Sequence, residues 1–195
     1  MENEEAYAAW KLHKPDTKFA VDELATLLGA ADESAEAVFS AYLFAKKAMA
    51  RSMQELLRAT LPPSRPAFDE LRSRVGGALQ ERFGDRIPER YLAVPYDSVA
   101  CQDLFGLLRE HLGKPVDAAV LRAINADDVH TERRIRELRE LGLRIDSVKR
   151  DGVGGYLLAS LDLDPALMPS LVAKAIKKAS LPEAEQKKLI AALDA

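Results

Sequence analysis

The pattern of apolar and polar positions predicts helices in the first third of the chain. Residues 17–61 have helical periodicity, and the run 21–28 forms a short predicted helix that Gly29 closes, since glycine is common just past a helix end. After a turn at residues 30–34, a second and longer helix continues until Pro62-Pro63. Proline stops a helix because it lacks a backbone N–H.

The longer helix has a stripe of apolar positions. Asp32 or Ser34 is its predicted cap, because a short polar side chain can accept from the free N–H groups of the first turn. The stripe recurs at spacings of four, three, four and seven, at Val38, Tyr42, Ala45, Met49 and Leu56. Such a stripe fits a packed seam against another helix. An intramolecular core face is the favoured interpretation, and a dimer contact is the alternative.

A short stiff connection at residues 62–66 separates this region from the next helix. Residues 68–83 are predicted to be helical, with one apolar face formed by Leu71, Val75 and Leu79. Gly76-Gly77 weakens this prediction, because glycine inside a helix costs roughly 1 kcal/mol relative to alanine. Residues 84–95 are predicted to be an irregular connector.

The last segment, residues 165–195, has the pattern of two short amphipathic helices. The first is lined by Leu167, Leu171, Ala175 and Ile176. The second is predicted to begin with Ser180 as its cap, followed by Pro182 in the first turn.

Another predicted helix begins near residue 98. Asp97 or Ser98 can cap it, and Gly113 ends it. Its apolar residues are Val99, Leu104, Leu107, Leu108 and Leu112. Residues 114–116 are then predicted to be extended, since proline disfavours helix in the residue before it.

Two more helices follow, separated by a short turn. Asp117 is the predicted cap of a short helix at residues 118–124. The turn at 125–128 is rich in side chains that bond to backbone groups. The next helix spans residues 129–141, and Gly142 closes it.

Residues 144–150 and 155–159 alternate like paired strands around a predicted turn at 151–154, which contains the glycines of a hairpin. Helix, short helix, turn, longer helix and hairpin is the order of a winged helix-turn-helix. The predicted fold class is therefore mainly α, with a winged helix-turn-helix and a small β-hairpin wing, flanked by N-terminal and C-terminal helices.

The helix at 129–141 has the composition of a recognition helix. Ile135, Leu138 and Leu141 can pack inward, while other faces present Arg133, Arg134, Arg136 and Arg139. The planar fork of arginine pairs bidentately with guanine edges or phosphates. Residues 129–150 contain seven basic and four acidic side chains, a local balance opposite to that of the whole chain.

The run from His130 to Gly142 and its hairpin resemble winged-helix modules of two kinds. One kind occurs in bacterial transcription regulators, and the other is appended to some restriction endonucleases. The resemblance implies that Arg133 and Arg134 face bases or phosphates and that Lys149 and Arg150 lie on the wing. The complete set of predicted DNA-binding residues is His130, Thr131, Arg133, Arg134, Arg136, Lys149 and Arg150.

Acidic residues depart from this pattern. Asp127, Asp128 and Glu132 lie at the start of the recognition helix, where residues that face DNA usually are. They would repel phosphates unless they cap the helix or accept from cytosine amino groups. The alternative interpretation is a solvated helix whose charges pair four residues apart, as Glu132–Arg136, Arg133–Glu137 and Arg136–Glu140.

Composition limits the partner and the compartment. The formal net charge is −3 and the pI about 5.7, so any DNA affinity must come from a local basic face. The single cysteine, Cys101, excludes an internal disulfide and suits a reducing compartment. Residues 1–5 lack the layout of a signal peptide, and no apolar run approaches the ~18 residues of a membrane span. We expect a cytoplasmic protein with no membrane partner.

No motif indicates chemistry. His13, His111 and His130 lack metal-ligand spacing, and the glycines at 152–155 do not lead from a strand into a helix as in a phosphate loop. We therefore expect no catalytic residue, no metal, no cofactor and no enzyme activity. A nuclease centre built from residues distant in sequence is the least favoured alternative.

Four segments follow from these patterns: an N-terminal helical region at 1–62, a helix and connector at 63–97, the winged helix-turn-helix at 98–162 and a C-terminal helical pair at 163–195. The first segment is assigned to dimerisation or to a weak second helix-turn-helix. Residues 21–39 resemble the latter, but Glu36 and Ser40 replace a basic face, so an ordinary helical hairpin is favoured.

The leading functional hypothesis is a sequence-specific protein that binds double-stranded DNA, as a transcription regulator or as the recognition component of a restriction or defence system. A homodimer is expected, because one recognition helix reads few base pairs. The alternative is a protein-interaction adaptor that uses its winged helix to dock a larger complex.

Overall fold

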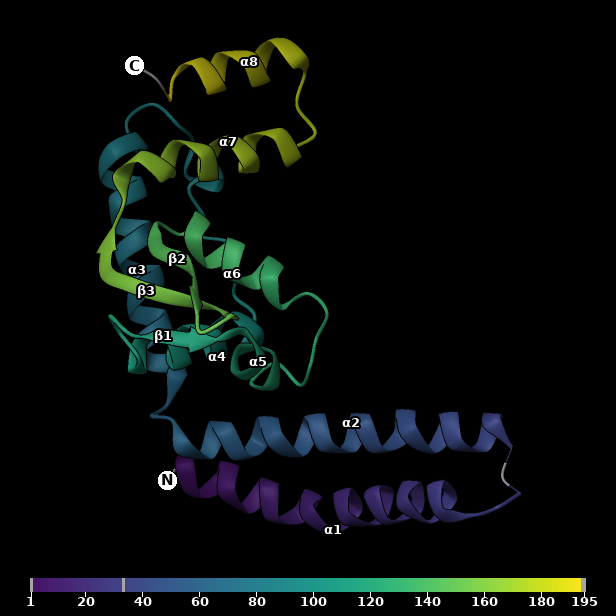
Figure 1. The fold of residues 1–195 in the computed structure, drawn as a ribbon. Helices are drawn as coiled ribbons and strands as arrows, with labels where there is room; N and C mark the ends of the chain where they lie inside the picture. Colours follow the sequence, from purple (N-terminus) through teal and green to yellow (C-terminus); the bar gives the residue numbers. More distant parts are fainter. Residues whose placement is uncertain (1, 33, 194–195) are drawn as a thin grey trace. The chain divides into compact units, whose positions relative to one another are not determined.

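The structure, a computed structural model, describes residues 2–32 and 34–193 (Figure 1). Glu33 of the predicted turn lies outside these residues, as do the ends of the two terminal segments. The chain forms two compact units, one from Met1–Pro63 with Ala118–Thr131 and the other from Ser64–Asp117 with Glu132–Ala195. Each unit combines two stretches that are separate in the chain. The division into four consecutive segments therefore stays a prediction.

The first unit contains a hairpin of two long helices, α1 (Glu2–Gly29) and α2 (Ala35–Thr60), which lie side by side (Figure 1). Their seam is made of small buried side chains, namely Ala20, Ala41, Ala45 and Ser52. The predicted stripe is right at Ala45 but wrong at Tyr42 and Met49, which are 45% and 41% exposed. A two-helix hairpin buries only a narrow strip, and small residues in that strip let the two backbones approach closely.

Helix α1 is much longer than the predicted helix at 21–28, which forms only its last two turns. Pro15 lies inside α1 and cannot donate a hydrogen bond to the carbonyl of Lys11. The prediction failed upstream because tertiary packing supplies most of a helix's stability, and α2 supplies a packing partner here. The predicted cap of α2 is confirmed, since the Ser34 hydroxyl accepts from the Ala37 N–H at 3.1 Å.

The remainder of this unit is a short helix, α5 (Ala118–Ala123), and the turn after it. Helix α5 contacts α2, and the Gln54 side-chain amide donates to the carbonyl of Ile124 at 2.9 Å. In the turn, Ala126 and Asp127 have φ values of 50° and 57°. The predicted short helix and turn are both present.

The second unit is built on two contacting helices, α3 (Ser64–Phe83) and α4 (Val99–Glu110). The predicted apolar face of α3 is confirmed, and its buried residues are Phe68, Leu71, Val75, Leu79 and Phe83. The ring centroids of Phe68 and Phe105 are 5.8 Å apart. The helices meet closely at Gly106, where a Cβ would lie 2.7 Å from the Cβ of Ser64.

The connection between α3 and α4 is irregular, as predicted, apart from a 3₁₀ turn, η1 (Glu89–Tyr91). Ser98 caps α4, because its hydroxyl accepts from the Cys101 N–H at 3.2 Å. Of the apolar residues predicted for α4, those in its middle are buried, whereas Val99 and Leu112 are 59% and 43% exposed.

Three antiparallel strands form a small sheet in this unit, in the order β1 (Pro115–Asp117), β3 (Val153–Leu163) and β2 (Leu143–Arg150). Arg150 pairs with Val153, so the hairpin turn consists of Asp151 and Gly152 alone. Their φ values of 51° and 84° suit a two-residue turn. The predicted turn at 151–154 is too long, because the Asp-Gly pair already supplies both left-handed positions.

Strand β1 is more than the extended step that the sequence predicted. It pairs with β3, where Val116 lies opposite Tyr156 and Asp117 opposite Gly155. A Cβ on Gly155 would lie 2.4 Å from the carbonyl oxygen of Val116. Only glycine therefore allows this approach of the two strands.

Helix α6 (Thr131–Glu140) corresponds to the predicted recognition helix. Ile135 and Leu138 are fully buried, and Leu141 is 1% exposed. The predicted inward face of this helix is therefore confirmed.

The C-terminal helices are α7 (Met168–Lys178), which follows a 3₁₀ turn, η2 (Pro165–Leu167), and α8 (Glu183–Ala191). The buried residues of α7 are Met168, Leu171, Val172 and Ile176. The predicted cap of α8 is wrong, because Pro182 occupies the N-cap position and Ser180 precedes it by two residues.

The predicted fold class is confirmed: the chain is mainly helical, with a small antiparallel sheet and flanking helices. The order α4, β1, α5, α6, β2, β3 is compatible with a winged helix-like fold. Among the helices of residues 2–32 and 34–193, none has the length and apolar character needed to span a membrane.

Candidate nucleic-acid interface

Two arginines of α6 share one buried carboxylate. Glu137 is 5% exposed, and it accepts from Arg134 Nη1 at 2.7 Å and from Arg133 Nε at 3.1 Å. The Arg133 side chain is 61% exposed and that of Arg134 only 26%. Arg133 is therefore available to a ligand, whereas most of Arg134 faces the protein.

The ionised form of Glu137 is stabilised by these partners. Burial raises the pKa of Glu137, but hydrogen bonds from Arg134, Cys101 and Arg133 outweigh it, so the pKa lies below its ordinary value. The Cys101 Sγ is 3.5 Å from Glu137 Oε2. Burial raises the pKa of the Cys101 thiol to about 11, which agrees with a buried structural cysteine and not a reactive one.

The far end of α6 is held by a second group of polar side chains. Glu140 accepts hydrogen bonds from the Tyr96 hydroxyl and the Lys174 ammonium. Burial, and then the bond to Glu140, raises the pKa of Tyr96. Tyr96 also has a φ of 67°, a value uncommon for a residue with a side chain.

These contacts test two of the ion pairs that the solvated-helix alternative predicted for α6. The predicted Arg133–Glu137 pair is confirmed. Glu140 bonds to Tyr96 and Lys174, so the predicted Arg136–Glu140 pair is not formed. The Arg136 side chain is exposed.

Arg139 has a structural position between α6 and the sheet. Its guanidinium donates to the carbonyl of Ile145 at 2.6 Å and to the Ser147 hydroxyl at 3.0 Å. It also lies over the ring of Tyr156, 5.6 Å from the centroid. This arginine joins the helix to the hairpin.

The residues before α6 divide into buried and exposed groups. Thr131 is 2% exposed, and its hydroxyl donates to the carbonyl of Asp128 at 2.8 Å. The Asp128 carboxylate accepts from the His130 N–H at 2.9 Å. The Asp128 carboxylate thus bonds to the backbone of the turn before α6 and not to an N–H of the helix itself. His130 is exposed, but the Thr131 side chain is not accessible for the predicted contact with DNA.

The hairpin tip presents the two predicted wing residues to solvent. Lys149 is exposed, and the Arg150 side chain is 80% exposed, with Asp151 as a weak partner at 3.7 Å. Arg144 at the start of β2 is 73% exposed. The accessible cations of α6 and the hairpin are therefore Arg133, Arg136, Arg144, Lys149 and Arg150.

Sequence reasoning missed the polar contacts that position α6. Tyr96 and Lys174 lie 44 and 34 residues from Glu140 in the chain, so no local spacing could relate them. The predicted pairs joined Glu137 to Arg133 alone, although Arg134 is three residues before Glu137 and helical spacing could also have indicated this second pair. Among the described residues no group of three or more His, Cys, Asp and Glu side chains is arranged to hold a metal ion.

Comparison with known proteins gives one family match. A protein-family model described as the KpnI N-terminal domain matches residues 102–159, which extend from α4 into β3. No curated protein and no solved structure matches the chain. The matched segment contains α6, β2 and the first part of β3.

Proposed function

We propose that the chain is a sequence-specific DNA-binding protein in which α6 enters the major groove and the hairpin contacts the backbone. The observation that supports this most is the division of α6 into two faces. Ile135 and Leu138 are fully buried, while Arg133 and Arg136 are exposed on the same ten-residue helix. A recognition helix needs this combination of a packed side and a guanidinium-bearing side.

The family match supports a restriction-related role over transcription regulation. The model is named for the N-terminal domain of KpnI, a restriction endonuclease, and it covers both α6 and the hairpin. We therefore propose that this chain serves as a recognition component of a restriction or defence system. A transcription regulator is the second candidate.

The proposed contacts have different tasks. Arg133 is held by Glu137 and is still accessible, so its fork can approach a base edge in one preferred orientation. Arg136 is assigned to the same face. Lys149 and Arg150 are assigned to phosphates, because cations at an exposed tip position a protein on the duplex without reading sequence. Arg134 is assigned to orienting Glu137.

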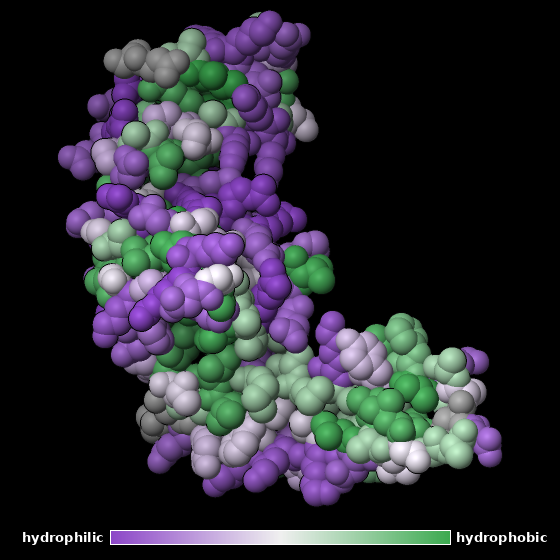
Figure 2. Space-filling view, viewed as in Figure 1, coloured by the Kyte–Doolittle hydropathy of each residue, from purple (hydrophilic) through white to green (hydrophobic). Residues whose placement is uncertain are grey.

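We further propose a homodimer formed through the α1–α2 hairpin. Figure 2 shows apolar side chains gathered over this hairpin, at the end where α2 begins. On α2, exposed apolar residues recur at helical spacing away from the alanine seam, at Phe39, Tyr42, Met49 and Met53. A second copy of the hairpin would cover them, and two modules would read a symmetric site.

No catalytic step is part of this proposal. The acidic side chain of α6 with a lowered pKa, Glu137, is buried and bonded to two arginines. Incubation with plasmid DNA and magnesium tests this point, and cleavage that survives purification to homogeneity would overturn it.

Selection of bound duplexes from random DNA tests the main proposal. We expect one sequence to be enriched, with an affinity that falls steeply as salt rises. The variant Arg133→Ala/Arg136→Ala should lose affinity for the selected duplex by roughly 30-fold to 10⁴-fold, since each of the two bidentate contacts is worth about 1–3 kcal/mol. Lys177→Ala, at an exposed cation of α7, is the matched control and should bind like the parent. Failure to enrich any sequence would favour the protein-interaction adaptor instead.

A further inference from the structure

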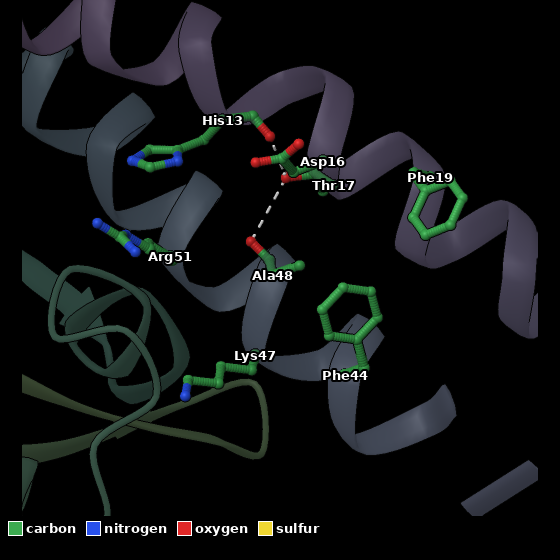
Figure 3. A pocket seen from close by; sticks show the side chains of 8 residues that line it. All are labelled: His13, Asp16, Thr17, Phe19, Phe44, Lys47, Ala48 and Arg51. Carbon is green, nitrogen blue, oxygen red and sulfur yellow. Dashed lines mark hydrogen bonds between the residues drawn. The ribbon is translucent and has the colours of Figure 1, made fainter. Parts of the chain in front are cut away.

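The α1–α2 hairpin contains a hollow that the DNA-binding proposal does not use. Its volume is about 320 Å³, at the lower end of the range for small-molecule sites. Helix α1 contributes His13, Asp16, Thr17 and Phe19, and α2 contributes Phe44, Lys47, Ala48 and Arg51 (Figure 3). All of these residues belong to the first compact unit.

Two phenyl rings form one end of the hollow. Phe19 and Phe44 come from different helices, and Figure 3 shows both rings at the same end. They are 64% and 47% exposed, so each leaves apolar surface in water. A flat ring placed against them would remove that surface from solvent and gain stacking contacts.

Cationic side chains form the other end. Lys47 and Arg51 are one turn apart on α2, and the imidazole of His13 lies on the same side as Arg51 (Figure 3). Among the described residues, no carboxylate oxygen lies within 4.0 Å of a side-chain nitrogen of Lys47 or Arg51, so neither forms an ion pair. An anion would therefore meet positive charge that is not already neutralised.

The floor of the hollow is made of small side chains. Thr17 donates its hydroxyl hydrogen to the carbonyl of His13 at 2.8 Å, and its oxygen lies 3.5 Å from the carbonyl of Ala48 (Figure 3). Ala48 is partly exposed at this level of α2. A larger side chain at position 48 would occupy the space between the rings and the cations.

We propose that this hollow binds a nucleoside monophosphate. The base lies against Phe19 and Phe44, and the phosphate accepts from Arg51 and Lys47. The Asp16 carboxylate would repel a second anion, but it can accept from an amino group of the base or a ribose hydroxyl. A nucleotide is the class of small anion that uses all three features at once.

Calorimetric titration of the full chain with AMP tests the site, with adenosine and inorganic phosphate as separate probes of its two ends. We expect AMP to bind with a Kd on the order of 10–100 µM, and each fragment at least tenfold more weakly. Phe44→Ala should weaken AMP and adenosine alike. Arg51→Gln and Lys47→Gln should weaken AMP at least fivefold without changing adenosine.

Lys46→Gln is the matched control, because Lys46 is the neighbouring exposed lysine of α2 and does not line the hollow. It should bind AMP within twofold of the parent. Ala48→Leu should abolish binding, with an unchanged far-ultraviolet circular dichroism spectrum. Absence of AMP binding at millimolar concentration would overturn the proposal, as would equal losses in Lys46→Gln and Lys47→Gln. A change of oligomeric state in Phe44→Ala without AMP binding would also overturn it, because the rings would then face a second copy.

Discussion

At the scale of single residues, the positions of the α6 arginines depend on the hydrogen bonds that the Glu137 carboxylate accepts. Two arginines and one thiol donate to its carboxylate, which is almost fully buried. The exposed Arg133 contributes little to stability, because solvent screens an ion pair at the surface. The hydrogen bond from Arg134 is better shielded from solvent than the one from Arg133. It gives the buried Glu137 carboxylate a partner in the interior.

Glu137→Gln should therefore destabilise the protein by about 1–3 kcal/mol, since a neutral amide cannot satisfy both guanidinium groups. Urea unfolding at pH 7 measures this. Glu110→Gln, at an exposed acid of α4, is the control and should change stability by no more than about 0.5 kcal/mol. Equal stability of Glu137→Gln and the parent would show that this carboxylate does not hold the arginines.

The same residue predicts a dependence on pH. Burial opposes the charge of Glu137, but the Arg134, Cys101 and Arg133 bonds hold its folded-state pKa below the ordinary 4.5. The unfolded state therefore binds the proton first as the pH falls, and the stabilisation is present above pH 4.5 and lost as the pH falls through the folded-state pKa. The stability difference between the parent and Glu137→Gln should shrink in that range, and a difference that stays constant would contradict the assignment.

At the scale of elements, α6 and the hairpin are joined by apolar packing and by Arg139. Leu138 is fully buried, and truncation of such a side chain leaves a cavity. Leu138→Ala should cost about 2–5 kcal/mol by chemical denaturation. A variant that unfolds at the parent's denaturant midpoint would show that the inward face of α6 is wrong.

The hairpin tip gives an independent prediction. Lys149→Glu/Arg150→Glu should change the free energy of unfolding by less than about 0.5 kcal/mol, because both side chains are solvated. The variant should bind all DNA sequences more weakly and with a flatter salt dependence, since it loses phosphate contacts. Salt titration of duplex binding measures this, with Lys177→Glu/Lys178→Glu on α7 as the charge-matched control. The parent's salt slope in the hairpin variant would exclude a DNA-contacting wing.

At the scale of the whole molecule, the net charge is −3. The positive charge of the proposed DNA interface is therefore confined to a local cluster of side chains. A homodimer would place two such clusters on DNA and so contact more base pairs than one copy can. Met49→Glu/Met53→Glu places charges on exposed positions of α2 outside its buried seam. We expect this variant to be monomeric by light scattering, still folded, and without the parent's preference for a symmetric duplex over a single half-site. A parent protein that is monomeric at all concentrations would contradict the proposed dimer.

Local patterns predicted much of the fold because the relevant physics acts within a few residues. Ser34 and Ser98 cap their helices by accepting from the backbone N–H of the residue three positions later. Ile135, Leu138 and Leu141 share one helical face because of their spacing alone. The exposed hairpin tip follows from alternation and an Asp-Gly turn. The same patterns predicted most of the accessible cations of α6 and the hairpin, but not that Thr131 is buried.

The sequence by itself determined the order of most helices and of the two hairpin strands, the inward face of α6 and the basic character of its exposed side. Only the tertiary structure decided that small alanines form the α1–α2 seam, that Thr131 is buried, and that Tyr96 and Lys174 both bond to Glu140. The reason is that periodicity reports which side of an element is apolar, whereas burial and hydrogen bonding depend on what lies opposite. That partner can be tens of residues away in the chain.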